Sequence, residues 1–189
     1  MRKVGIILSV LTLIAMTVSA QDTLTISTLR MGPFKLEVKK TEVEQILGKQ
    51  LTFNKKLTYK DKYGTRINID VLYNSISITM SFLFEPDTDD QDSLQLIYMS
   101  TKDPRVRTLS GLGIGSSKTD LLNAFSDKYN INLYFLYKYN KFTGKTERDT
   151  QKRIFSILDN DAGTQLQFIL QNNIVTEIIV CRSDEDSGD

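Results

Sequence analysis

The residues that could do chemistry in this chain are acidic or glycine-rich, because the chain contains no histidine. The usual general base, the Ser-His-Asp and Cys-His arrangements and the commonest transition-metal ligand are therefore missing. An enzyme would need paired carboxylates, a perturbed lysine or a cofactor site instead. Asp70 is one available carboxylate, but no spacing in the chain indicates a convergent group around it. We predict no catalytic residues, no cofactor and no enzymatic activity, and an enzyme that uses carboxylates is the least favoured reading.

The densest group of carboxylates lies in residues 85–92, whose sequence is EPDTDDQD. Several oxygens close together are what a hard cation such as Ca²⁺ requires. A calcium loop beginning at Asp87 would have its central glycine at position 92 and its glutamate at position 98, where the chain has Asp92 and Tyr98. We expect a solvated loop and no metal ligands, with calcium binding as the less favoured alternative.

A glycine-rich segment, GLGIGSS at residues 111–117, precedes a predicted helix whose first backbone amides could hold an anion. The segment is not a Walker A motif, and no parallel strand follows the helix as it does in nucleotide-binding folds. A turn that leads the chain into its helix is the favoured interpretation.

The first 20 residues have the pattern of a signal peptide. Arg2 and Lys3 precede a largely apolar run over residues 4–18, and Ser19 and Ala20 are small residues at the cleavage position. This run is too short to cross a bilayer, and Gln21 offers no thiol for a lipid anchor. We expect an exported protein, periplasmic or secreted, whose mature chain has no integral membrane segment.

The charge balance and the cysteine content argue against two further classes of protein, those that bind nucleic acid and those stabilised by internal disulfides. The chain has 24 basic and 23 acidic residues, and this balance argues against a nucleic-acid partner, which requires a basic surface. Cys181 is the only cysteine, so no disulfide can form within the chain. We predict that Cys181 is buried in the last strand, and a reactive or intermolecular thiol is the alternative.

Apolar residues alternate with polar ones in several segments, which predicts strands with one buried face. In the first half the buried set is Ile76, Ile78, Met80, Phe82 and Phe84, and Asn74 with Ser75 forms a two-residue turn before it. Ser77, Thr79 and Ser81 then lie on the opposite, wetter face. In the second half the same reasoning places Tyr134, Leu136, Lys138, Gln165 and Gln167 on that face.

Two helix signals divide the chain into similar halves. Ser117 and Asp120 form a capping box before one helix, and Gly48 ends the other. The sequences KTEV and LTYK at positions 40 and 57 recur as KTDL and FLYK at positions 118 and 135, with a constant spacing of 78 residues. We predict an α+β fold of two tandem units, each a short helix packed on a four-stranded antiparallel sheet. The units span residues 21–103 and 104–182, and residues 183–189 form an acidic disordered tail.

This layout resembles the tandem-repeat beta-lactamase inhibitor protein fold. The residues that carry the resemblance are VKKTEVEQILG at 38–48 and IGSSKTDLLNAF at 114–125. The start of each unit resembles that of the small outer-membrane assembly lipoproteins, which share the single-unit fold. The resemblance implies a non-catalytic fold whose sheet surface binds protein. The inhibitor proteins carry disulfides and tryptophan-bearing contact surfaces, whereas this chain has one cysteine and no tryptophan. Inhibition of a beta-lactamase is therefore not carried over.

These observations predict an exported non-catalytic module that binds a protein partner through the solvent-exposed face of its sheets. A carrier of a small apolar ligand in the cell envelope is the alternative. The predicted partner-binding residues are Ser77, Thr79, Ser81, Tyr134, Leu136, Lys138, Gln165 and Gln167.

Overall fold

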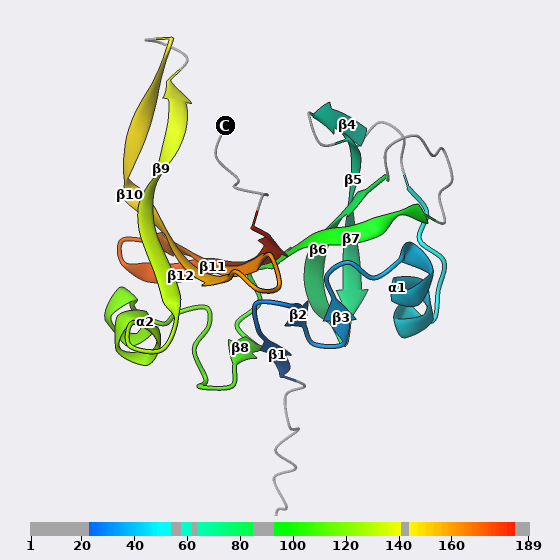
Figure 1. The fold of residues 1–189 in the computed structure, drawn as a ribbon, viewed down its shortest axis with the longest axis horizontal. Coiled ribbons are helices and arrows are strands. Elements are labelled where there is room, and N and C mark those ends of the chain that lie inside the picture. The colour runs from blue at the N-terminus through cyan, green and yellow to red at the C-terminus, as the bar shows by residue number, and fades with distance from the viewer. Residues whose placement is uncertain (1–22, 54–57, 62–63, 85–92, 141–143, 184–189) are drawn as a thin grey trace, which may run out of the picture.

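The computed structural model describes residues 23–53, 58–61, 64–84, 93–140 and 144–183, which form two sheets and two short helices (Figure 1). The larger sheet has eight strands in the order β4-β5-β6-β7-β12-β11-β10-β9, and the smaller has four in the order β3-β2-β1-β8. The eight strands are β4 (Thr58–Asp61), β5 (Gly64–Tyr73), β6 (Ile76–Leu83), β7 (Gln95–Thr101), β9 (Asn130–Asn140), β10 (Lys145–Asp159), β11 (Thr164–Gln171) and β12 (Ile174–Arg182). The other elements are β1 (Leu24–Ile26), β2 (Arg30–Met31), β3 (Phe34–Lys35), β8 (Val106–Thr108), α1 (Lys40–Leu47) and α2 (Lys118–Phe125).

The predicted fold class, an α+β fold of two units that each pack a helix on a four-stranded sheet, is wrong. The protein consists mostly of strands, and β7 pairs antiparallel with β12, so that one eight-stranded sheet runs through both halves. This pairing places Tyr98 opposite Cys181 and Thr101 opposite Ile178. Two separate sheets would each leave an additional edge of unpaired backbone groups, and joining them satisfies those groups. Residue patterns along the chain do not report which strands become neighbours.

The small sheet is the second difference from the predicted fold, which contains no such sheet. Its strands are two or three residues long, too short for an alternation pattern to reveal them. β1 pairs parallel with β8, so Leu24 lies opposite Val106, which follows the large sheet's β7 in the chain. The small sheet therefore ties the start of the described chain to the connection between the two halves.

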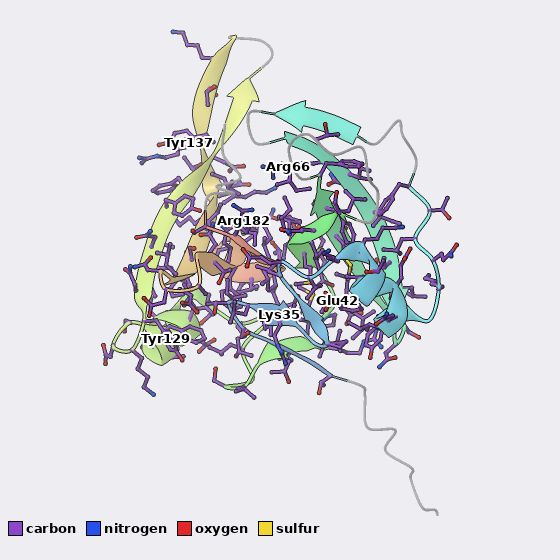
Figure 2. The ribbon with its side chains drawn as sticks, turned by 45° about the vertical axis from the view of Figure 1, so that its right-hand side comes forward. Lys35, Glu42, Arg66, Tyr129, Tyr137 and Arg182 are labelled. Atoms are coloured by element: carbon purple, nitrogen blue, oxygen red, sulfur yellow. The ribbon has the colours of Figure 1, made fainter. Side chains whose placement is uncertain are left out.

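The main core lies between the large sheet and the layer formed by the helices and the small sheet. Phe125 of α2 packs on Phe155 and Phe168, while Phe34 of β3 meets Tyr73 edge to face. We call this side of the large sheet the covered face and the other side the open face. Both ends of the sheet bend away from the covering layer, so the open face is concave (Figure 1). Figure 2 shows Arg66 and Tyr137 toward the two raised ends.

Local predictions about strands and turns are confirmed. Ile76, Ile78, Met80 and Phe82 are fully buried on the covered face. Asn74 and Ser75 form the two-residue turn between β5 and β6 with positive φ angles of 48° and 61°, as this kind of hairpin turn requires.

The predicted helix signals are confirmed as well. In α2 the Ser117 hydroxyl accepts from the Asp120 amide at 3.1 Å, and the Asp120 carboxylate accepts from the Ser117 amide at 2.8 Å. Gly48 ends α1 with a φ of 64°, a left-handed conformation that glycine adopts without steric cost.

Candidate binding surface

Four of the predicted partner-binding residues come together on the open face, because β7 and β12 are neighbours: Thr79 and Ser81 from the first half, and Gln165 and Gln167 from the second. One row of paired positions crosses seven of the eight strands. Its members are Asp70, Thr79, Ser100, Ile179, Gln167, Ser156 and Asn132. The adjacent row contains Asn68, Ser81, Tyr98, Cys181, Gln165, Leu158 and Asn130. Residues chosen from separate halves of the sequence thus belong to one continuous surface.

The centre of the open face is buried, although the sequence predicts a solvent-exposed face there. Gln165 and Gln167 are only 2% and 0% exposed, and Ser81 and Ser156 are also buried. The Ser156 hydroxyl donates to Gln165 Oε1 at 2.8 Å, and Gln167 Nε2 donates to the Tyr134 hydroxyl at 3.3 Å. Gln167 Oε1 has no hydrogen-bond partner among the described residues. Alternation reports which face a side chain is on, but it does not report whether water reaches that face.

A small apolar cluster shares the open face with these polar groups. Ile154, Ile169, Ile179 and Cys181 are buried together, and Tyr98, Tyr134 and Leu136 pack against them. The prediction that Cys181 is a buried thiol in the last strand is confirmed. Lys138 follows Leu136 on β9, at the backbone position paired with Glu147 of β10. The open face therefore combines aliphatic, aromatic and amide groups within a short distance of one another.

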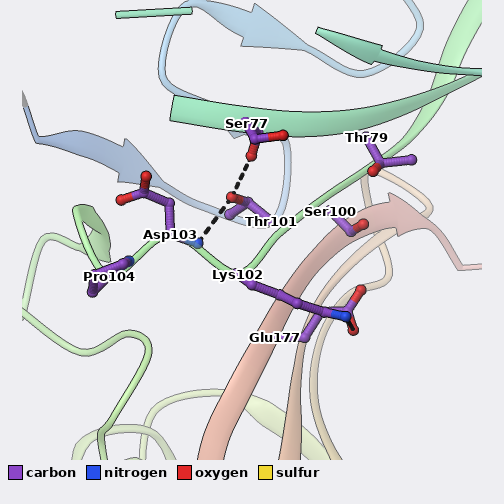
Figure 3. Close-up of a pocket in the computed structure, with 8 residues that line it drawn as sticks. All are labelled: Ser77, Thr79, Ser100, Thr101, Lys102, Asp103, Pro104 and Glu177. Carbon is purple, nitrogen blue, oxygen red and sulfur yellow. Dashed lines mark hydrogen bonds and ion pairs between the residues drawn. The ribbon is translucent and has the colours of Figure 1, made fainter. Parts of the chain in front are cut away.

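A hollow of about 430 Å³ lies where the two halves of the sheet meet (Figure 3). It is lined by Ser77 and Thr79 of β6, Ser100 and Thr101 of β7, the following residues Lys102, Asp103 and Pro104, and Glu177 of β12. Lys102 Nζ lies 3.6 Å from Glu177 Oε2, so an ion pair joins the two sides of the hollow. Ser100 and Glu177 are not among the residues predicted from the sequence. Leu96 lies on the covered face and Tyr98 on the open face, because the register of β6 and β7 shifts between them, so alternation from Leu96 would have assigned Ser100 to the covered face.

One rim of the hollow is held in place by Asp103 and Arg105. The Arg105 side chain donates to both carboxylate oxygens of Asp103, at 2.9 Å and 2.6 Å, and also to the Ser75 carbonyl oxygen at 2.8 Å. These hydrogen bonds from Arg105 hold the pKa of the Asp103 carboxyl below its usual value. The pair connects the turn between β5 and β6 to the segment that leads from the large sheet to the small one.

The other candidate sites have ordinary structural roles or lie outside the described residues. The amide of Gly115 donates to the Val175 carbonyl and that of Gly113 to the Ser116 hydroxyl, so these amides are not directed at an anion. Asp70 accepts a hydrogen bond from the Thr79 hydroxyl at 2.6 Å. Within the described ranges, no three acidic or cysteine side chains form a group able to hold a metal ion. The acidic segment 85–92 lies outside those ranges.

Comparison of the chain with protein-family models, curated proteins and solved structures finds no match. The resemblance to the beta-lactamase inhibitor protein fold therefore stays a prediction. In the part of the chain that the structure describes, neither helix is long and apolar enough to span a membrane.

Proposed function

We propose that this protein is an exported, non-catalytic binding module whose open face binds a protein partner. The observation that carries the proposal is that four residues predicted from separate halves of the chain belong to two continuous rows across one concave face: Thr79, Ser81, Gln165 and Gln167. The covered face is already filled by the helices and the small sheet, so the open face is the large surface left for a partner.

The chemistry of the open face favours a protein over a small apolar ligand. Tyr98 and Tyr134 present aromatic rings beside hydroxyl and amide groups, and aromatic residues within a polar surround are typical of protein interfaces. The hollow at the centre is lined by hydroxyls and by the Lys102–Glu177 ion pair, which do not suit an apolar ligand. The resemblance to a fold that binds protein through its sheet points the same way.

Site-specific photocrosslinking tests the proposal in the organism that makes the protein. A photoreactive phenylalanine analogue replaces Ser77, which is exposed at the rim of the hollow. The same analogue at Leu109, in the turn after β8 and 93% exposed, is the matched control on the other side of the large sheet. We expect a discrete protein adduct from position 77 and none from position 109.

The crosslinked partner must then bind the purified protein directly. We expect Ser77→Arg, which places a bulky charge at the rim, and Tyr134→Ala, which removes an aromatic contact, each to weaken binding at least about tenfold. Leu109→Arg should leave the affinity unchanged. The absence of an adduct at position 77, equal adducts at both positions, or equal binding by all variants would contradict the proposal.

A further inference from the structure

The two edges of the large sheet differ sharply in length and charge. β4, at one edge, has four residues, TYKD, two of which are charged. β9, at the other edge, has eleven residues, NINLYFLYKYN, with a single charge at Lys138 and no proline or glycine. Natural proteins protect exposed edges with short strands and charged residues, because an open edge pairs with other chains. β4 has this protection and β9 does not.

The sequence of β9 is complementary to itself in the antiparallel direction. When two copies are aligned antiparallel with Phe135 opposite Phe135, all eleven residues of each strand find a partner. The pairs are Asn130 with Asn140, Ile131 with Tyr139, Asn132 with Lys138, Leu133 with Tyr137 and Tyr134 with Leu136. No charge faces a like charge, and apolar or aromatic residues face each other.

The same register covers the exposed apolar residues of β9. Leu133 and Tyr137 are 39% and 58% exposed, so both present apolar surface to solvent. In the alignment centred on Phe135, Leu133 of each copy lies opposite Tyr137 of the other. Such cross-strand pairs of an aromatic and an aliphatic residue stabilise antiparallel sheets.

Two positive charges of each copy lie near the two-fold axis of this pairing. The guanidinium carbons of Arg148 and Arg153 lie 4.1 and 4.7 Å from the centre of the Phe135 ring, and both residues belong to β10. Three strand spacings, about 14 Å, would separate the two β10 strands of a dimer. The guanidinium groups over Phe135 lie closer to the axis than the β10 backbones, so their repulsion opposes the pairing, and added salt screens this repulsion.

We propose that two copies of this chain form a symmetric dimer by antiparallel pairing of their β9 edges around Phe135. The dimer extends the eight-stranded sheet of each copy into one continuous sheet, and its two-fold axis is perpendicular to the sheet. Both open faces then lie on the same side. The inference does not depend on the proposed function, because it concerns the edge of the sheet and not its open face.

Charge substitutions at the opposed pair test both the dimer and its register. In L133K/Y137K each new lysine faces a lysine of the other copy, and we expect dimerisation to weaken about 100-fold. In L133K/Y137E each new lysine faces a new glutamate, so dimerisation should be about tenfold stronger than in L133K/Y137K and should weaken with added salt. Leu109→Lys changes an exposed leucine far from β9 and is the control.

Sedimentation velocity of the purified protein over about 1–100 µM measures these affinities, and circular dichroism checks that each variant is folded. A wild-type dimer that L133K/Y137K dissociates and L133K/Y137E restores supports the proposal. A wild-type monomer throughout this range, a dimer insensitive to L133K/Y137K, or equal weakening in both double variants overturns it.

Discussion

The covered and open faces of the large sheet are made by alternate residues of the same strands, yet they exclude water in different ways. On the covered face, Phe168 and Ile178 are buried beneath the helices and the small sheet within the main apolar core. On the open face, Gln167 and Ile179 are nearly as buried, although only four buried residues form the apolar cluster there. A second layer closes the covered face, whereas on the open face the buried residues include glutamines and serines, and aromatic side chains pack against the small apolar cluster.

The covered face therefore contributes mainly to stability, and the open face is the one proposed for recognition. A core between two layers contributes the larger share of folding free energy, because it removes more apolar surface from water. A concave face with buried amides is poorer in apolar contacts but carries donors and acceptors with defined positions. Gln167 Oε1, without a partner in the described part of the chain, illustrates that the open face does not maximise stability. Three sets of substitutions test the comparison.

Neighbouring isoleucines on β12 provide the largest expected contrast. Ile178 belongs to the main core at 0% exposure, and Ile179 belongs to the small open-face cluster at 5% exposure. We expect Ile178→Ala to lower the free energy of unfolding by about 4 kcal/mol and Ile179→Ala by about 2 kcal/mol, because the smaller cluster loses fewer contacts. Urea unfolding measures both values. Equal losses would show that the two faces contribute equally to the free energy of unfolding, and would contradict the larger contribution assigned to the covered face.

Two glutamines on β11 should respond with opposite signs when each is replaced by methionine, which has a similar shape. Gln165→Met leaves the buried Ser156 hydroxyl without its acceptor, and we expect a loss of about 1–2 kcal/mol. Gln167→Met removes a buried carbonyl oxygen that has no partner among the described residues, but it also removes the amide that donates to the Tyr134 hydroxyl at 3.3 Å. We expect the balance to lie between about zero and a gain of about 1 kcal/mol. Thermal and urea unfolding measure the pair. A larger loss for Gln167→Met would mean that its amide is fully satisfied.

The Asp103–Arg105 pair, which fixes the rim of the hollow, gives the smallest effect and depends on pH. Its folded-state pKa lies below the usual value of 3.8, so the carboxylate stabilises the fold above that pH. The contribution is lost as the pH falls below 3.8 through the folded-state pKa. We expect Asp103→Asn to be less stable than wild type near about pH 6 and to approach it as the pH falls below 3.8 through the folded-state pKa. Asp161→Asn, in the exposed turn between β10 and β11, is the control; an unfolding difference that is independent of pH contradicts the assignment.

Interactions between residues near one another in the chain were accessible from sequence. The buried set from Ile76 to Phe82, the turn at Asn74 and Ser75 and the capping box at Ser117 each depend on a few adjacent residues, whose conformations are set by side-chain period and local hydrogen bonds. The same reasoning assigned Gln165 and Gln167 to the face that also carries Thr79. It did not find Ser100 or Glu177, because the strand pairing that brings them to the hollow is not local.

The residue pattern alone therefore determined which face each strand presents, where its turns fall and how its helices begin and end. Tertiary structure decided that β7 and β12 are neighbours, that the sheet has eight strands, and that β1 pairs with β8. It also decided that the polar centre of the open face is buried. Alternation is a property of one strand at a time, whereas sheet order and curvature minimise unpaired backbone and exposed apolar surface over the whole chain. The surface proposed for binding exists only because that global arrangement joins the two halves.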